Sequence, residues 1–325
     1  MNMKATTKQV NYINYLTSRL NRDKSTRNSE LTQGHLNWGL QNACNMTANE
    51  ASEWISHLKQ LIITVNGILT ASQHQCIGKA AELFGNGIIK LSTSFTIEVR
   101  GIPYEKINDF RKYIEKENLE TGGVGPRLRP VVSCIGTDCR YGLTDTLSLS
   151  DEIHERIYNK YKNVQLPHRF KVAISGCPND CTKINLCEIG IMSQYIPNFN
   201  EDKCKGCKKC SVEDICPMDA CKVEGEKLQM DKSICSNCGR CVGKCYFDAI
   251  VNGTYGYKVF IGGKGGKVKT EARALNKVFT SKEEIFDLIE KALLFYMENG
   301  QSKERFAKTI ERIGFEEVEK ELLSY

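Results

Sequence analysis

Hydrophobic and polar positions recur with a helical spacing at the start of the chain. Val10, Ile13, Leu16 and Leu20 would share one face of a helix. The segment Thr47-Ala-Asn-Glu50 has the pattern of a capping box, which satisfies the free backbone N–H groups at a helix start. Residues 1–60 are therefore predicted to form a small helical module. Because they carry no recognisable chemistry, we interpret this module as an accessory or docking unit.

From residue 61 onwards, helical and strand periods alternate. Thr70-Ala-Ser-Gln73 predicts the start of a helix that ends at Gly85. Residues 90–100 alternate apolar and polar side chains, which predicts one strand with Ser94 on its polar face. Further strands are expected over 169–175 and 256–262, and helices over 104–118, 150–162 and 281–300. This alternation predicts an α+β fold.

A cysteine-rich segment at residues 201–250 interrupts the α+β pattern, which continues on both sides of it. The 325 residues, of which 41% are hydrophobic, suffice for about two domains with buried cores. No apolar run approaches the roughly 18 residues of a membrane span, and the N-terminus lacks the apolar region of a secretory signal. We therefore expect no membrane association and a cytoplasmic location.

The net charge restricts the function only weakly. Lys and Arg number 45 against 39 Asp and Glu, which gives a net charge of +6. The basic residues are spread along the chain and form no recognition motif, so an iron–sulfur regulator that binds nucleic acid is disfavoured. The excess fits a local pocket for a small anion equally well.

The 16 cysteines indicate the chemical class. Thiols stay reduced in the cytoplasm, so spaced cysteines there indicate metal or iron–sulfur sites rather than disulfides. Twelve of the cysteines fall into spaced groups. The other four are interpreted as buried thiols: Cys44, Cys76, Cys187 and Cys221.

Two cysteine motifs lie within residues 201–250. The first motif comprises Cys204, Cys207, Cys210 and Cys216, and the second motif comprises Cys235, Cys238, Cys241 and Cys245. Their spacing is typical of a ferredoxin with two [4Fe–4S] cubanes, in which the fourth cysteine of each motif ligates the other cubane. The expected ligand sets are Cys204, Cys207 and Cys210 with Cys245, and Cys235, Cys238 and Cys241 with Cys216.

The first motif leaves two alternatives open. Five residues rather than three separate Cys210 from Cys216, so Cys221 is a second candidate for the fourth ligand. Structural zinc is the other alternative, although zinc sites usually pair two C-x-x-C hooks rather than use runs of three cysteines.

A third set of cysteines lies outside this segment and comprises Cys134, Cys139, Cys177 and Cys181. Cys177 directly follows the strand predicted over 169–175, so Cys177 and Cys181 are expected on the first turn of a helix. The set fits a third cubane, and the alternative is four unrelated buried thiols.

Three segments resemble the sirohaem-dependent sulfite and nitrite reductase family. They are Arg129-Pro-Val-Val-Ser-Cys134, Leu166-Pro-His-Arg-Phe-Lys171 and Ser175-Gly-Cys-Pro-Asn-Asp-Cys181. Within that family the chain is most similar to the small, ferredoxin-containing anaerobic sulfite reductases, over residues 61–325. The resemblance implies a ferredoxin-like half domain (61–125), a sirohaem and [4Fe–4S] domain in two parts (126–200 and 251–325) and an inserted two-cubane ferredoxin domain (201–250), after the helical module (1–60).

The resemblance also implies cofactors and site residues. Cys134, Cys139, Cys177 and Cys181 would hold a cubane, and Cys181 would also bind the iron of sirohaem, so that the chain carries one sirohaem and three [4Fe–4S] cubanes. A small anionic substrate would be surrounded by Arg129, Arg169 and Lys171, because fixed cations bind the anion and stabilise its departing oxygens. The carboxylates of sirohaem would contact Arg127, Arg140, Lys264 and Lys267. Ser94 stands where the family has an arginine, which removes one cation.

The leading prediction is a reductase that converts sulfite to sulfide with six electrons. Nitrite reduction by the same chemistry is one alternative, and a non-catalytic iron–sulfur electron-transfer subunit is another. The resemblance implies a ferredoxin or a flavoprotein subunit as the electron donor to residues 201–250. Long family members contain two related halves, whereas each motif set occurs once in this chain. We therefore expect the active site to be completed in trans, in a homo-oligomer or with a related subunit.

Overall fold

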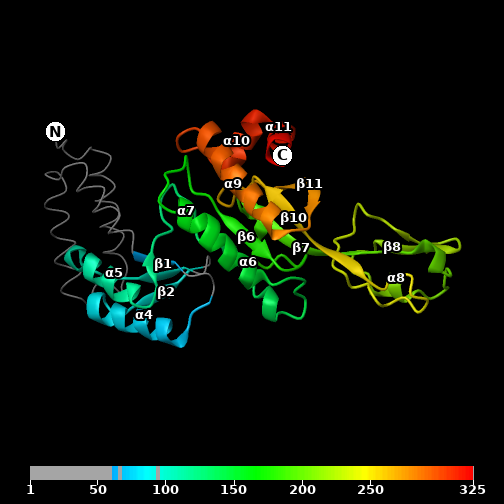
Figure 1. Ribbon diagram of the computed structural model, residues 1–325, viewed down its shortest axis with the longest axis horizontal. Helices are drawn as coiled ribbons and strands as arrows, with labels where there is room; N and C mark the ends of the chain where they lie inside the picture. Colours follow the sequence, from blue (N-terminus) through cyan, green and yellow to red (C-terminus); the bar gives the residue numbers. More distant parts are fainter. Residues whose placement is uncertain (1–60, 65–67, 93–95, 325) are drawn as a thin grey trace. The chain divides into compact units, whose positions relative to one another are not determined.

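The computed structural model describes residues 61–64, 68–92 and 96–324. The helical module predicted for residues 1–60 and the position of Ser94 lie outside the described residues. The chain divides into two compact units, residues 1–123 and 124–325 (Figure 1). Among the described helices, none is both long and apolar enough to cross a membrane.

The described part of the first unit is a four-stranded antiparallel sheet with two helices packed against it. The strands lie in the order β2-β3-β1-β4. They are β1 (Leu61–Thr64), β2 (Ile89–Leu91), β3 (Ile97–Val99) and β4 (Glu120–Thr121). The helices are α4 (Ala71–Phe84) and α5 (Ile107–Glu115), the latter preceded by the 3₁₀ turn η1 (Tyr104–Lys106). Helix α4 begins at the predicted capping box of Thr70 and Gln73.

The single strand predicted over residues 90–100 is wrong. The chain forms a hairpin there, in which β2 and β3 pair antiparallel with Lys90 opposite Glu98. The Ser92 and Thr96 hydroxyls lie 2.6 Å apart between the two strands. Facing residues of antiparallel strands point to the same side, so a period of two fits a hairpin as well as one strand and does not reveal where the chain reverses.

The second unit is built on a five-stranded mixed sheet, the core sheet, in the order β11-β10-β7-β6-β5. Its strands are β5 (Val132–Ser133), β6 (Val172–Ser175), β7 (Ile189–Pro197), β10 (Gly253–Ile261) and β11 (Arg273–Phe279). Strands β5, β6 and β7 are parallel, whereas β10 and β11 add in antiparallel fashion. Because β5 and β6 run in the same direction, the segments that follow them emerge at the same edge of the sheet.

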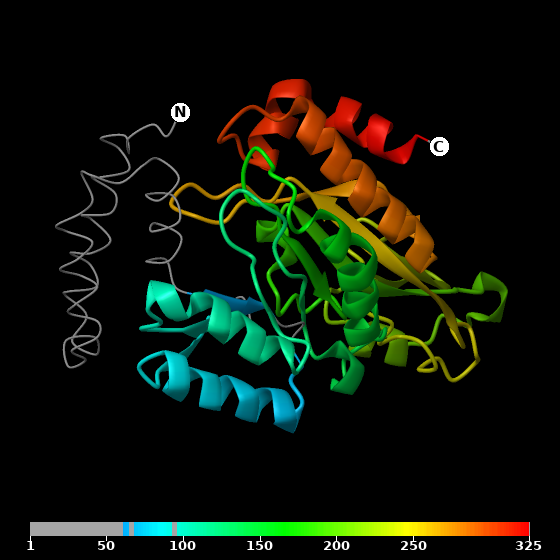
Figure 2. The same ribbon diagram turned by 60° about the vertical axis from the view of Figure 1, so that its left-hand side comes forward.

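The helices of the second unit pack on the core sheet and on one another (Figure 2). They are α6 (Thr146–Ile153), the π-helical turn η3 (His154–Tyr158), α7 (Asn159–Tyr161), α9 (Lys282–Asn299), α10 (Phe306–Ile313) and α11 (Phe315–Leu323). Helix α6 runs through η3 into α7 without a break, and Lys282 of α9 donates a hydrogen bond to Glu152 beside it. The rings of Phe170, Tyr296 and Phe306 contact one another in the core.

The cysteine-rich segment, residues 201–250, is named the insert. It leaves the core sheet at the ends of its two longest strands, β7 and β10, which pair as far as Pro197 and Gly253 (Figure 1). The insert contains the turn η5 (Glu201–Lys203), helix α8 (Ser211–Ile215) and a hairpin of β8 (Cys221–Glu224) and β9 (Lys227–Met230). It has a small core of its own around Val212, Leu228 and Ile250.

Candidate functional site

Four cysteines come together where β5 and β6 end. Cys134 follows β5 and Cys177 follows β6, and the Cys134 N–H donates to Ile174 O at 3.1 Å between the two strands. Burial raises the pKa of the Cys177 thiol, and the neighbouring thiols of Cys134, Cys181 and Cys139 raise it further. The two spaced pairs that the sequence set apart by about 40 residues therefore form one group, the core thiol site.

The helix predicted to begin at Cys177 is wrong. Residues 177–183 form turns, and the next helical residues are the 3₁₀ turn η4 (Ile184–Leu186). Asp180 adopts a left-handed φ of 47°, and its carboxylate accepts hydrogen bonds from Ser175 Oγ at 3.0 Å and Ile184 N at 2.9 Å. A short acidic side chain that bonds nearby groups in this way competes with helix formation. As a result Cys181 projects from a loop and is exposed.

Two glycines let the loops of the core thiol site approach each other. A Cβ atom on Gly136 would lie 2.8 Å from Thr146 Cγ2 and 3.2 Å from Gly176 Cα. A Cβ atom on Gly176 would lie 3.0 Å from Gly136 Cα. The Gly176 N–H donates to Cys134 Sγ at 3.1 Å, which is the type of contact that stabilises a thiolate ligand of an iron–sulfur cubane.

Three cations lie on the chain just before the core thiol site. Arg129 precedes β5, and its N–H donates to Phe170 O at 2.8 Å, which holds it beside Arg169 and Lys171 at the start of β6. Burial lowers the pKa of Arg129, and the positive charge of Arg169 lowers it further. Burial likewise lowers the pKa of Lys171, to which Arg169 and Arg129 contribute. The three predicted substrate cations therefore form one partly buried positive group.

The guanidinium of Arg169 has an incomplete set of partners. Its Nε is buried and has no hydrogen-bond partner among the residues that the structure describes. A buried N–H without a partner is costly, so native structures rarely contain one. An oxygen of a bound anion would supply the missing acceptor.

Sequence reasoning missed a buried carboxylate behind the cations. Glu188 is 0% exposed and accepts hydrogen bonds from Lys171 N at 3.0 Å and from Arg305 Nε at 2.9 Å. Burial lowers the pKa of nearby His168, and the charges of Arg305, Arg169 and Arg129 lower it further. An acidic residue at the start of the apolar strand β7 was the one available signal for Glu188. The charge of Glu188 acts on Arg129 and Lys171 as well as on Arg305, so several cations share this one carboxylate.

The structure places the four predicted sirohaem contacts on three segments. Arg127 is exposed in a bend two residues before Arg129, and Arg140 is exposed with its guanidinium 4.5 Å from the Tyr141 ring centre. Lys264 pairs with Thr270 at the base of a loop that also carries exposed Lys267. This loop lies close to the segment after Cys181, because a Cβ on Gly263 would meet Cys187 O at 2.3 Å.

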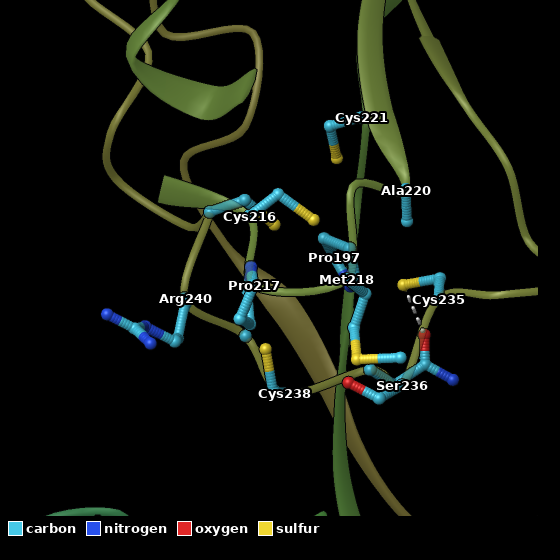
Figure 3. Close-up of a pocket in the computed structure, with 13 residues that line it drawn as sticks. Pro197, Cys216, Pro217, Met218, Ala220, Cys221, Cys235, Ser236, Cys238 and Arg240 are labelled. Atoms are coloured by element: carbon cyan, nitrogen blue, oxygen red, sulfur yellow. Dashed lines mark hydrogen bonds between the residues drawn. The ribbon is translucent and has the colours of Figure 1, made fainter. Parts of the chain in front are cut away.

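In the insert, five cysteines line one open cavity (Figure 3). Its lining includes all four members of one predicted ligand set, Cys216, Cys235, Cys238 and Cys241. Pro197, Pro217, Met218 and Ala220 complete much of the wall. Burial raises the pKa of the Cys235 thiol, and the thiols of Cys241, Cys238 and Cys216 add to the rise. The second motif and the last cysteine of the first motif therefore share one site, the insert cavity.

Cys221 lines the same cavity as a fifth thiol. Hydrogen bonding with Cys241 raises the pKa of the Cys221 thiol, and its burial and the Cys216 thiol act in the same direction. The same hydrogen bond lowers the pKa of Cys241 to about 7. Both candidates for the fourth ligand, Cys216 and Cys221, thus reach the cavity.

The cysteines of the other predicted ligand set of the insert do not line this cavity. Cys204, Cys210 and Cys245 belong to the small core of the insert, and Cys207 lies between them in the chain. Cys204 Sγ accepts a hydrogen bond from Leu228 N at 3.3 Å. In the described part of the chain, no three or more His, Cys, Asp or Glu side chains converge as around a single metal ion.

The insert cavity is joined to the core sheet by hydrogen bonds. Tyr195 N of β7 donates to Asn237 O at 2.8 Å, and the Asn237 amide donates to Gln194 Oε1 at 3.1 Å. A Cβ on Gly239 would lie 2.5 Å from the Tyr195 ring, which shows how closely the second motif approaches β7. The second motif is therefore held directly against the core sheet.

Two family models match this chain. Residues 124–325 match the nitrite and sulphite reductase 4Fe-4S domain, and residues 61–117 match the nitrite/sulfite reductase ferredoxin-like half domain. The chain belongs to the nitrite and sulphite reductase family. The family prediction, which rested on the segments around Cys134 and Cys181, is confirmed, and with it the prediction of an iron–sulfur oxidoreductase.

Three curated relatives have sequences that are 30–33% identical to parts of this chain. An uncharacterised protein of Methanocaldococcus jannaschii is 30% identical over 252 residues, which are 78% of this chain and 86% of that protein. The coenzyme F420-dependent sulfite reductase of the same organism is 33% identical over 71% of this chain and 36% of its own length. An anaerobic sulfite reductase polypeptide of Salmonella typhimurium is 31% identical over 44% of this chain and 45% of its own length. The chain thus spans less than half of these two named sulfite reductases.

Solved structures of the family share the fold. Dissimilatory sulfite reductase I matches with a TM-score of 0.66 and 19% identity, over 82% of this chain and 68% of that chain. The NirA protein of Mycobacterium tuberculosis matches with a TM-score of 0.55 and 15% identity, over 80% and 39% of the two chains. The predicted α+β fold of the sulfite and nitrite reductase type is confirmed.

Proposed function

We propose that this chain is a sirohaem and iron–sulfur reductase that converts sulfite to sulfide. The observation that carries the proposal is that β5 and β6 join two groups: the partly buried cations Arg129, Arg169 and Lys171 before the strands begin, and the core thiol site where the strands end. Thiols can hold a redox centre, and buried cations without enough counter-charge can hold an anion. Relatives named as sulfite reductases support sulfite as that anion.

Three [4Fe–4S] cubanes and one sirohaem fit the residues present. One cubane would bind Cys134, Cys139, Cys177 and Cys181, and the other two would bind the two ligand sets of the insert. The hydrogen bond from Gly176 N to Cys134 Sγ and the cavity lined by five thiols suit such ligands. Exposed Cys181 would also hold the iron of sirohaem, with Arg127, Arg140, Lys264 and Lys267 near its carboxylates. When bound, sirohaem and its cubane would supply electrons and an open iron position.

The protein side chains bind the anion and provide protons. Arg169 has a buried Nε ready to donate to a sulfite oxygen, and Arg129 beside it balances the double negative charge. Lys171, whose pKa is lowered by burial, gives up a proton more readily than an ordinary lysine. Glu188 holds Arg305 and the Lys171 backbone and so fixes the arrangement.

Electrons would enter through the insert from a protein donor, a ferredoxin or a flavoprotein subunit. The hydrogen bonds between Asn237 and residues 194–195 hold the second motif at the core sheet, so its cubane would be the one that passes electrons inward. The first motif, with exposed Lys205, Lys208 and Lys209 between its cysteines, would face the donor. Exposed Cys181 also supports an active site completed in trans, in a homo-oligomer or by a related subunit.

Nitrite is a second candidate substrate, because a nitrite reductase large subunit of Klebsiella oxytoca is 30% identical over 133 residues. The test uses the full chain purified anaerobically with its cofactors. We expect visible tetrapyrrole bands, and sulfide from sulfite faster than ammonia from nitrite with reduced methyl viologen as donor. Protein that lacks tetrapyrrole bands after supply of sirohaem would instead be a non-catalytic electron-transfer subunit. Light scattering tests assembly, since a fully active monomer contradicts a site completed in trans.

A further inference from the structure

Five thiols line the insert cavity, whereas a cubane takes four. Four of them, Cys216, Cys235, Cys238 and Cys241, form a complete ligand set, and Cys221 is the additional one. The question is what a fifth thiol does at this position. The answer rests on the proposed function in one respect only, namely that the insert cavity holds a cubane.

The position of Cys221 is fixed by the pairing of a β-strand. It is the first residue of β8 and pairs with Met230 of β9, and the next pairs of the hairpin continue in register. Its side chain is 2% exposed. Figure 3 shows its sulfur pointing from the strand into the cavity, on the same side as Cys216. The thiol is therefore held in advance at the place where a ligand would be needed.

Cys216, the other candidate for the fourth ligand, lies outside the helices and strands, whereas Cys221 belongs to β8. It follows α8 and precedes Pro217, after the spacer of five residues that lengthens the first motif. Only four residues separate it from Cys221, and the two thiols contact each other. Cys241 also contacts Cys221, but it lies inside the regular C-x-x-C-x-x-C run of the second motif. If one thiol of this site is exchanged, Cys216 is the one that Cys221 can replace without rearrangement of that run.

We infer that Cys221 is a reserve ligand of the cubane in the insert cavity and takes the place of Cys216 when Cys216 is lost. In the exchange the iron–sulfur bond to Cys216 breaks and a bond from the same iron to Cys221 forms. The proton of the Cys221 thiol passes to the released sulfur group of Cys216, or to solvent when that side chain has been removed, and no electron is transferred. The site would thereby keep its cubane when a partly exposed ligand has been damaged by oxidation.

The experiment compares three variants with the wild-type holoprotein: Cys216→Ala, Cys221→Val and the double variant. Valine fills the space of the thiol and avoids a cavity. Iron and acid-labile sulfide are determined, and the electron paramagnetic resonance spectrum of the reduced protein is recorded. We expect each single variant to keep the full iron content, and Cys216→Ala to shift the signal of one cubane. The double variant should lose about four iron atoms per chain.

Two outcomes would overturn the inference. Loss of the cubane in Cys216→Ala alone means that Cys221 does not substitute, and loss in Cys221→Val alone means that Cys221 is the resident ligand. The signal of the cubane bound by Cys204, Cys207 and Cys210 must persist in every variant and serves as the folding control. Wild-type protein without any cubane in the insert would contradict the proposed function instead, so the two failures are distinguishable.

Discussion

Cys181 of the core thiol site is exposed on a loop. The thiols of the insert cavity instead line one pocket together with Pro197, Pro217 and Met218. The two sites differ as much in charge. Three partly buried cations precede the two strands that lead to the core thiol site, while Arg240 is the one charged residue in the lining of the cavity. Both sites offer sulfur ligands for a redox centre, but they differ in whether a substrate, water or a small anion can reach that centre.

This difference assigns a separate task to each site. A redox centre that must meet a substrate needs an open side and groups that bind the substrate and its protons. A centre that only relays electrons needs neither, and an apolar wall keeps water and small anions away from it. The exposed Cys181 and the cations that precede the same two strands suit the core thiol site to the first task. The largely apolar lining suits the insert cavity to the second task.

The largest effect is expected from Cys181→Ala, which should break one site and spare the other. Removing the thiol that would link the cubane to sirohaem is expected to abolish the tetrapyrrole bands and the reduction of sulfite. The insert should keep both of its cubanes, because all of its predicted ligands belong to residues 201–250 and none to the loop that carries Cys181. The measurement is a visible spectrum together with electron paramagnetic resonance of the reduced protein.

Cys187→Ala is the matched control for that variant. Cys187 is a partly buried thiol only six residues further along the chain, and it belongs to none of the three predicted ligand sets. It is expected to retain the tetrapyrrole bands. Equal loss of the bands in both variants would mean that the loop, rather than the Cys181 thiol, is responsible.

A smaller effect is expected from Arg169→Gln, which tests the substrate side of the core thiol site. A hydrogen bond to a charged group contributes about 1.5–3 kcal/mol, so KM for sulfite should rise roughly tenfold to a hundredfold. Arg169 also lowers the pKa of Lys171, so its removal should let that pKa rise and move the alkaline limb of the activity profile to higher pH. Steady-state kinetics across pH measure both effects.

Arg156→Gln provides the control for Arg169→Gln. Arg156 is a half-exposed arginine of η3 paired with Glu283 on the surface. Its removal should leave KM and the pH profile unchanged. An unchanged pH profile in Arg169→Gln would argue against Lys171 as the proton donor, whatever happens to KM.

The sequence could predict those parts of the structure that depend on local signals. The predicted helix ends at Thr70 and Gly85, and the bounds of the helix predicted over 281–300, agree with the structure. Two predictions from local signals were wrong, one because a side chain bonds nearby groups and one because the chain reverses direction. Asp180 bonds its own neighbours and replaces the expected helix by turns, and the hairpin of β2 and β3 has the same period of two as a single strand.

The candidate site was predictable only in part. Cysteine spacing and resemblance indicated the core thiol site and its three cations before any geometry was known. The contact of Glu188 with Arg305 could not be foreseen, because 117 residues separate them and only the packing of α10 near β7 brings them together. The unsatisfied Nε of Arg169 is likewise a property of the packed structure.

The smallest effect concerns the cations on the insert, which are exposed, whereas Arg129, Arg169 and Lys171 are partly buried. Lys208 and Lys209 lie between cysteines of the first motif. Exposed charges at the rim of an interface chiefly change the association rate and its salt dependence. Lys208→Gln/Lys209→Gln should therefore slow reduction by an acidic ferredoxin by about threefold to tenfold at low salt and weaken the salt dependence.

Lys222→Gln/Lys232→Gln removes the same charge from the β8–β9 hairpin and the loop after it, and should have little effect. Reduced methyl viologen, a small cation, should reduce both variants at wild-type rates, so a slower reaction with this donor as well would locate the defect in the cubanes rather than in docking.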